Sequence, residues 1–187
     1  TTTVTVTAED NYSNTSTCTF DVVVSDTTNP VITCADAPGT AEATSSSGAA
    51  VSYDDASATD TGDDDVAITY SAASASTFAI GTTTVTATAT DDSGNTHTCT
   101  FDVVVADTTD PTITCPSAPA TTEATSSSGA AVSYDDASAT DAVDSDVAIS
   151  YSAASASTFA IGTTTVTVTA EDNYSNTSTC TFDVVVS

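Results

Sequence analysis

Aspartate supplies most of the side chains in this sequence that could do chemistry. A run of the form D-x-x-D-x-D begins at Asp60 and again, 81 residues later, at Asp141. Hard carboxylate oxygens in such a run are the ligands that calcium takes, although the glycine and glutamate positions of an EF-hand loop are missing. We therefore expect a calcium site, with a solvated acidic loop as the alternative, and no cofactor that the chain requires. With acidic residues of neighbouring segments, the candidate ligands are Asp26, Asp60, Asp63, Asp65, Asp91, Asp107, Asp141, Asp144, Asp146 and Asp172.

Catalysis has little support in these residues. His97 is the single histidine, and serine stands 81 residues to either side of it, at Ser16 and Ser178. Paired aspartates can act as acid and base, but polar loops without pocket aromatics would not move their pKa values apart. No C-x-x-C motif and no histidine at ligand spacing indicates zinc. We predict that the chain is not an enzyme.

The charge balance excludes two classes of partner. The chain has 26 acidic residues and neither lysine nor arginine, which gives a formal net charge of -26. Binding of nucleic acid or of an anionic membrane surface needs the opposite sign, so neither partner is expected. Repulsion among the carboxylates must be relieved by water, salt or bound cations.

Two pairs of N-glycosylation sequons lie in polar turns between predicted strands. Their acceptor residues are Asn11 and Asn14 in one turn and Asn173 and Asn176 in the other. The matching turn at residues 91–95 has no sequon. We expect glycans at these asparagines, with unused sequons as the alternative.

An internal repeat organises the chain. Residues 1–25 recur letter for letter as residues 163–187, and residues 26–106 align without gaps on residues 107–187, with 64 of 81 positions identical. We therefore predict complete repeats at 26–106 and 107–187, preceded at 1–25 by the last two strands of an incomplete one. Upstream sequence of the same chain, or strands from another copy, is expected to cover that hairpin.

Short strands separated by turns are predicted within each repeat. Val and Ala alternate with Thr over residues 82–90, and Cys, Phe and Val alternate with polar residues over 96–105, as in a hairpin with one buried face. With the other short segments the count reaches about seven, which is typical of a two-sheet β-sandwich. Those segments are 30–34, 40–44, 49–53, 66–70 and 77–80.

The linkers between repeats are short and stiff. Residues 26–30 and 107–111 each end in a proline, which locks φ. Successive domains are therefore expected to stack end to end as a rod. In a sandwich the D-x-x-D-x-D loop and the loop at 91–95 lie at the same pole as the incoming linker, so three acidic segments should converge at each junction.

Four segments of the last repeat carry a recognisable pattern: DTTDPTITCP (107–116), SATD (138–141), FAIGTTTVTVTAED (159–172) and NTSTCTFDVVV (176–186). These residues resemble the HYR (hyalin repeat) domain family, and the resemblance covers the whole chain. It implies an immunoglobulin-like fold and extracellular proteins associated with adhesion. The fold class expected is all-β, with tandem immunoglobulin-like β-sandwich domains. One departure is Ala35, where the pattern has proline after cysteine.

Each complete repeat contains two cysteines. If its first and last strands run parallel at the sandwich edge, Cys34 and Cys99 lie at the same height, as do Cys115 and Cys180, so a disulfide is expected within each pair. Cys18 is expected to pair with an upstream cysteine. Disulfides persist in oxidising compartments, so we expect the protein outside the cell or at its surface.

The sequence favours a structural function, in which stiff repeats form an extracellular fibre, stalk or filament. The partners would be further copies of the same repeat, in one long chain or in a fibre. A calcium-dependent cell-adhesion module that binds a protein or glycan partner is the alternative. Recognition loops should diverge between copies and display aromatics or arginine. Here the copies are nearly the same, and few such side chains beyond Tyr12 and Tyr174 are expected at the surface.

Overall fold

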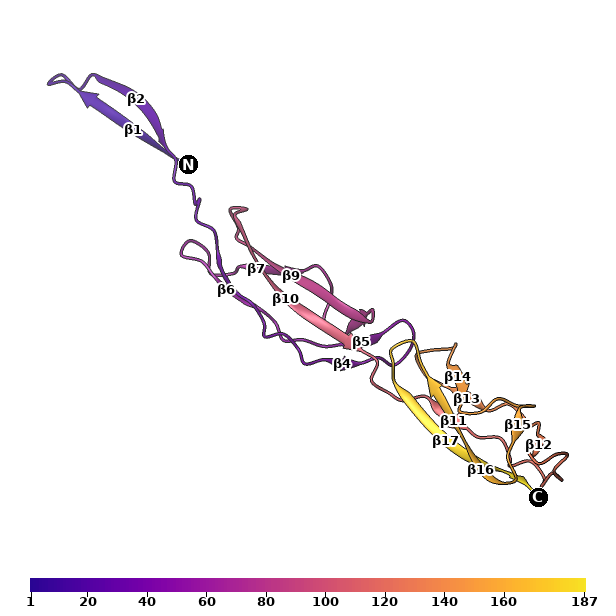
Figure 1. The fold of residues 1–187 in the computed structure, drawn as a ribbon. Helices are drawn as coiled ribbons and strands as arrows, with labels where there is room; N and C mark the ends of the chain where they lie inside the picture. Colours follow the sequence, from indigo (N-terminus) through magenta and orange to yellow (C-terminus); the bar gives the residue numbers. More distant parts are fainter. The chain divides into compact units, whose positions relative to one another are not determined.

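Every regular element of this protein is a β-strand. The computed structural model describes residues 1–187 (Figure 1) and contains no helix, so the all-β prediction is confirmed. The chain forms two compact units, each built from three segments. The first unit comprises Thr1–Asp36, Asp54–Ala72 and Val85–Phe101, and the second comprises Ala37–Tyr53, Ala73–Thr84 and Asp102–Ser187.

The first unit contains three separate antiparallel pairings, and β9 also pairs with β10 in the sheet β4-β10-β9-β7, which it shares with the second unit. β1 pairs with β2, β3 with β6, and β7 with β9. A disulfide joins Cys34, just after β3, to Cys99 on β10, with 2.12 Å between the sulfurs. The strands named here are β1 (Thr2–Glu9), β2 (Thr15–Val22), β3 (Val31–Thr33), β6 (Ser57–Thr59), β7 (Ala67–Tyr70), β9 (Gly81–Thr90) and β10 (Thr96–Ala106), the last two shared with the second unit.

The second unit holds the remaining strands. β4 pairs in parallel with the end of β10, and β5 pairs with β8. The rest form a three-stranded sheet β14-β16-β17 and the pairs β11-β13 and β12-β15. A second disulfide, 2.01 Å between sulfurs, joins Cys115 and Cys180. The bounds are β4 (Ala41–Glu42), β5 (Ala49–Val51), β8 (Ser76–Phe78), β11 (Thr112–Thr114), β12 (Ala130–Ala131), β13 (Ser138–Thr140), β14 (Ala148–Tyr151), β15 (Thr158–Phe159), β16 (Gly162–Glu171) and β17 (Thr177–Val186).

A sandwich core lies between the sheets of the second unit. Alternate residues of β16, among them Val166 and Val168, are fully buried, and the threonines between them face outward. Phe159 from β15 joins them from the opposite layer, and Tyr134 meets Phe182 edge-on with ring centroids 4.8 Å apart. The apolar–polar alternation in the sequence therefore produces two packed layers.

One turn in each repeat depends on glycine. Gly48 and Gly129 have φ values of 101° and 104°, a left-handed conformation that favours glycine. A Cβ at either position would also collide with a backbone carbonyl oxygen, that of Phe78 or Phe159. The S-S-S-G turn can therefore pack against the strand that precedes the long hairpin.

The repeated 25-residue sequence forms the same hairpin in two different surroundings. β1-β2 and β16-β17 pair in the same register, with Val6 opposite Cys18 in one and Val168 opposite Cys180 in the other. Their exposures differ widely, because Val6 is 48% exposed and Val168 is fully buried. The hairpin is thus specified by its own residues, and its burial depends on the strands that cover it.

Two details of the predicted sheet were wrong. β6 and β13 lie at residues 57–59 and 138–140, where no strand was predicted, and they pair with β3 and β11. The parallel partner of β10 is β4 rather than the first strand of the repeat. Pro38 lies between β3 and β4, and proline cannot donate to a ladder, so the edge is split into two short strands.

The two copies of the hairpin offer a matched test of burial. Val168→Ala removes two buried methyl groups and is expected to lower the free energy of unfolding by about 2 kcal/mol. The same substitution at Val6 should cost little, because that side chain is half exposed. Thermal and urea unfolding of the two variants would measure both effects, and equal losses would contradict this account of the core.

Candidate metal centre

A five-residue turn of the form D-x-x-x-N ends each long hairpin. In the second unit the Asn176 backbone N–H donates to Asp172 Oδ1 at 2.8 Å, and Asn176 Nδ2 donates to Asp172 Oδ2 at 2.7 Å. Asn95 donates in the same way to Asp91, with both distances 2.8 Å. A carboxylate that accepts several hydrogen bonds fixes the turn around itself. The turn therefore holds the first aspartate in one orientation.

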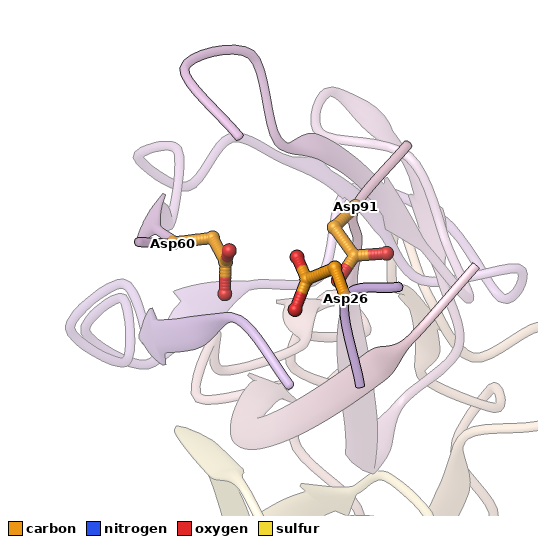
Figure 2. Close-up of side chains that lie close together, drawn as sticks. All are labelled: Asp26, Asp60 and Asp91. Carbon is orange, nitrogen blue, oxygen red and sulfur yellow. The ribbon is translucent and has the colours of Figure 1, made fainter. Parts of the chain in front are cut away.

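Three aspartates from separate segments meet at the end of each such hairpin. In the first unit Asp26 precedes β3, Asp60 follows β6 and Asp91 follows β9. A carboxylate oxygen from each lies within 4.8 Å of the others, and Figure 2 shows Asp60 and Asp26 turned toward each other with Asp91 beside Asp26. In the second unit Asp107, Asp141 and Asp172 meet in the same way, each with a carboxylate oxygen within 4.8 Å of the others.

Backbone donors hold the middle aspartate of each cluster. The N–H of Gly62 donates to Asp60 Oδ1, and the N–H of Val143 donates to Asp141 Oδ1, each at 2.7 Å. A side chain at Gly62 would collide with Asp26 Oδ2. Val143 occupies the equivalent position and is itself buried. The two clusters thus share their three aspartates and this backbone hydrogen bond, but they differ in the residue that donates it and in how close that residue lies to the linker aspartate.

Asp107 is the least satisfied carboxylate of the second cluster. It is 6% exposed, and Oδ1 accepts the Thr109 N–H at 3.2 Å, whereas the buried Oδ2 has no hydrogen-bond partner. Burial, followed by the negative charges of Asp141, Asp172 and Glu42, raises the pKa of Asp107 despite the bond from Thr109. An ionised Asp107 therefore destabilises this site unless a cation compensates for it.

Asp172 and Asp91 behave in the opposite way. Burial is the largest single influence and raises the pKa of each, but the hydrogen bonds from the asparagine and from other turn residues together outweigh it and lower the pKa. Both carboxylates are therefore kept ionised beside their neighbours. Carboxylates that stay ionised in a partly buried cluster provide the oxygen ligands that a hard cation requires.

The other candidate ligands anchor loops. Asp63 accepts the backbone N–H groups of Asp65 and Asp92, and Asp144 accepts those of Asp146 and Asn173, all at 2.9 Å. These bonds tie the acidic loop to the hairpin turn. The structure therefore brings six of the ten predicted ligands into two clusters and leaves outside them Asp63, Asp65, Asp144 and Asp146.

Glu42 is a site residue that the sequence analysis missed. Its carboxylate accepts hydrogen bonds from the Thr108 N–H at 2.8 Å, the Thr108 hydroxyl at 2.6 Å and the Thr109 hydroxyl at 2.8 Å. Those threonines follow Asp107 in the linker. Glutamate is rare in this chain and recurs 81 residues later as Glu123, a signal that could have identified the position.

The remaining predicted residues occupy the turns and the disulfides. Asn11, Asn14 and Asn173 are exposed, and Asn176 is partly buried. Cys18 is exposed and unpaired in this structure, whereas the other four cysteines form the two disulfides described above. The structure has no helix long and apolar enough to cross a lipid bilayer.

Comparison with known proteins finds matches over nearly the whole chain. A model of the HYR domain matches residues 25–105 and 106–186. A protein named Hyalin, from Strongylocentrotus purpuratus, is 34% identical over 182 residues, which is 94% of this chain and 15% of the relative. The chain therefore spans a small part of that relative's length.

Among solved structures, similarity is found to the protocadherin gammaB7 EC3-6 cis-dimer, with a TM-score of 0.41 and 18% identity over 99% of this chain and 57% of the other. Extracellular cadherin domains 3-6 of protocadherin gamma B2 give a TM-score of 0.39 and 14% identity over 99% and 56%.

The hydrogen bonds on Glu42 predict its titration. The Thr108 hydroxyl, followed by the Thr108 N–H and the Thr109 hydroxyl, lowers the pKa of Glu42 from 4.5. Because the pKa of Glu42 is lower in the folded than in the unfolded chain, the ionised side chain stabilises the fold at pH values above the unfolded pKa. This stability is lost as the pH falls through the folded-state pKa. NMR titration of the side-chain carboxyl should place Glu42 below 4.5, and Thr108→Val should raise it. Thr27→Val, at the same position of the preceding linker, is the control and should leave the Glu42 titration unchanged.

Proposed function

The chain belongs to the HYR domain family, and from this premise we propose that it is a structural segment of an extracellular fibre or stalk built from repeated, disulfide-stapled domains. The observation that carries the proposal is the contact between Glu42 and the linker. Three hydrogen bonds from Thr108 and Thr109 join the linker to a strand of the preceding repeat. A linker held in this way resists bending more than a free one, as a load-carrying repeat requires.

An extracellular location is supported by the cysteines. Two disulfides, each closing a loop of 65 residues, staple the sandwich domains. In the chain-entropy model a loop of this length contributes roughly 4 kcal/mol. Such bonds persist in oxidising surroundings. The family is one of adhesion-associated modules, so the proposed function is not enzymatic.

Calcium binding at the aspartate clusters forms part of this proposal. The donors are hard carboxylate oxygens from three segments, and the buried Asp107 Oδ2 has no hydrogen-bond partner. No lysine or arginine exists in the chain to neutralise them. Calcium accepts six to eight oxygen ligands in flexible geometry, so these carboxylates with water would suit it. Asp107, Asp141 and Asp172 would hold the ion in one cluster, and Asp26, Asp60 and Asp91 in the other.

A calcium-dependent adhesion module is the second candidate, and the exposed tyrosines favour it. Tyr12 is 88% exposed and Tyr174 is 43% exposed, both on hairpin turns. Tyrosine on a protruding turn is a common anchor in protein interfaces. The two functions share the calcium sites and differ in whether the repeats bind a different molecule.

Removal of calcium should lower the melting temperature of the chain. At a calcium concentration 100 times Kd, each site would contribute about 2.7 kcal/mol to stability. Asp107→Asn should raise the melting temperature in a chelator, because it removes a buried charge, and should lower the gain that calcium gives. Asp183→Asn, an equal change of charge on an exposed part of β17, is the control. Scanning calorimetry of the unsubstituted chain and both variants, with and without calcium, measures these shifts, and an equal calcium shift in both variants would place the ion elsewhere.

Electron microscopy of native material tests the structural function. We expect extended particles or a regular lateral assembly made of many repeats. Single compact particles that attach to cells only in the presence of calcium would support the adhesion module instead. Extended particles that shorten on chelation would be the result expected if calcium stiffens the linkers.

A further inference from the structure

Two sequons compete in the turn between β16 and β17. Asn173 and Asn176 are three residues apart, and each begins an N-x-S sequence. The sequon motif does not distinguish the two asparagines, because it consists of three residues only. The hydrogen bonds of their side chains differ.

Both hydrogens of the Asn176 amide nitrogen are already used. Nδ2 donates to Asp172 Oδ2 at 2.7 Å and to the Asp107 backbone oxygen at 3.3 Å. An asparagine amide has two N–H bonds and no more. A sugar on Nδ2 would replace one of them and would occupy the space next to the linker or next to the turn.

The other complete repeat shows that this role is independent of glycosylation. Asn95 donates to Asp91 Oδ2 at 2.8 Å and to the Asp26 backbone oxygen at 3.4 Å. It is followed by Thr96 and His97, so no sequon exists there. The same asparagine is thus retained for its contacts where no glycan can be attached.

Asn173 occupies a position whose side chain is free to vary. It is exposed, and the equivalent residue in the other complete repeat is Asp92. In both repeats only the backbone N–H of this residue is bound, by Asp144 Oδ2 or Asp63 Oδ2 at 2.9 Å. A glycan at Asn173 would project into solvent without removing a contact of the turn.

We propose that Asn173 carries an N-linked glycan and that Asn176 stays unmodified. This rests on the proposed extracellular location. In the transfer, a bond forms between Nδ2 of Asn173 and the anomeric carbon of an oligosaccharide donated as its lipid pyrophosphate. The bond from that carbon to the pyrophosphate oxygen breaks, and the pyrophosphate leaves with the proton from Nδ2.

The full chain, secreted from a eukaryotic host, tests the proposal. Because residues 1–25 repeat as 163–187, the background carries Asn11→Gln and Asn14→Gln so that only one turn is read. Intact mass should show one glycan. Enzymatic release in heavy-oxygen water, which labels the asparagine that carried the glycan, should mark Asn173. Adding Asn173→Gln should abolish the glycan.

A second pair of variants separates glycan loss from misfolding. Asn176→Gln should keep the single glycan but lower the melting temperature by several degrees, as should Asn95→Gln at the matched position. A glycan that persists in the Asn173→Gln variant, or a label at Asn176, would overturn the proposal. A secreted chain with both disulfides formed and no glycan would also overturn it while leaving the extracellular function standing.

Discussion

The constraint on which this structure depends is that 26 acidic side chains must be accommodated without one lysine or arginine. Ion pairs with a strong base are unavailable, so a carboxylate that leaves bulk water must find N–H or O–H donors or a cation from solution. Asp172 finds its donors in its own turn, and Asp144 finds them in the backbone of Asp146 and Asn173. These hydrogen bonds stabilise the carboxylates and at the same time fix the conformation of the loops.

Asp107 shows the limit of that solution. Only one of its oxygens receives a donor, and the other is buried beside further carboxylates. Its charge can be neutralised by a proton, which the raised pKa favours, or by a cation from solution. The Glu42 carboxylate receives its hydrogen bonds from the linker residues Thr108 and Thr109. The same need of carboxylates for donors therefore fixes the conformation of the linker.

Sequence alone predicted the features that are encoded locally. The long hairpin follows from alternation along a few residues, and the identical sequences at 1–25 and 163–187 form it in the same register whether or not it is covered. β6 was missed because Ser57–Thr59 is short and polar, and its pairing with β3 joins residues far apart in the chain. Local patterns carry no information on such a pairing.

The candidate site was predicted only in part, because local patterns show which segments carry acidic residues but not which side chains face one another. Convergence of the linker, the acidic loop and the hairpin turn could be expected from sandwich topology, and Asp26, Asp60 and Asp91 do meet. The spacing of the D-x-x-D-x-D run could not distinguish a ligand from a loop anchor, because Asp63 differs from Asp60 in which backbone N–H groups it faces. Glu42 lies even further from the run, and only the fold brings it to the linker.

The turn at the end of the long hairpin combines a fixed part with a variable one. Its aspartate and asparagine, five residues from first to last, make the same contacts in both complete repeats. The residue after the aspartate is Asp92 in one copy and Asn173 in the other, and its side chain is bound in neither. Since the contacts of the turn do not use this side chain, the position can change between a carboxylate and an asparagine without altering them. Successive repeats can therefore present different surface chemistry on the same scaffold, which lets a chain of nearly identical domains carry a pattern along its length.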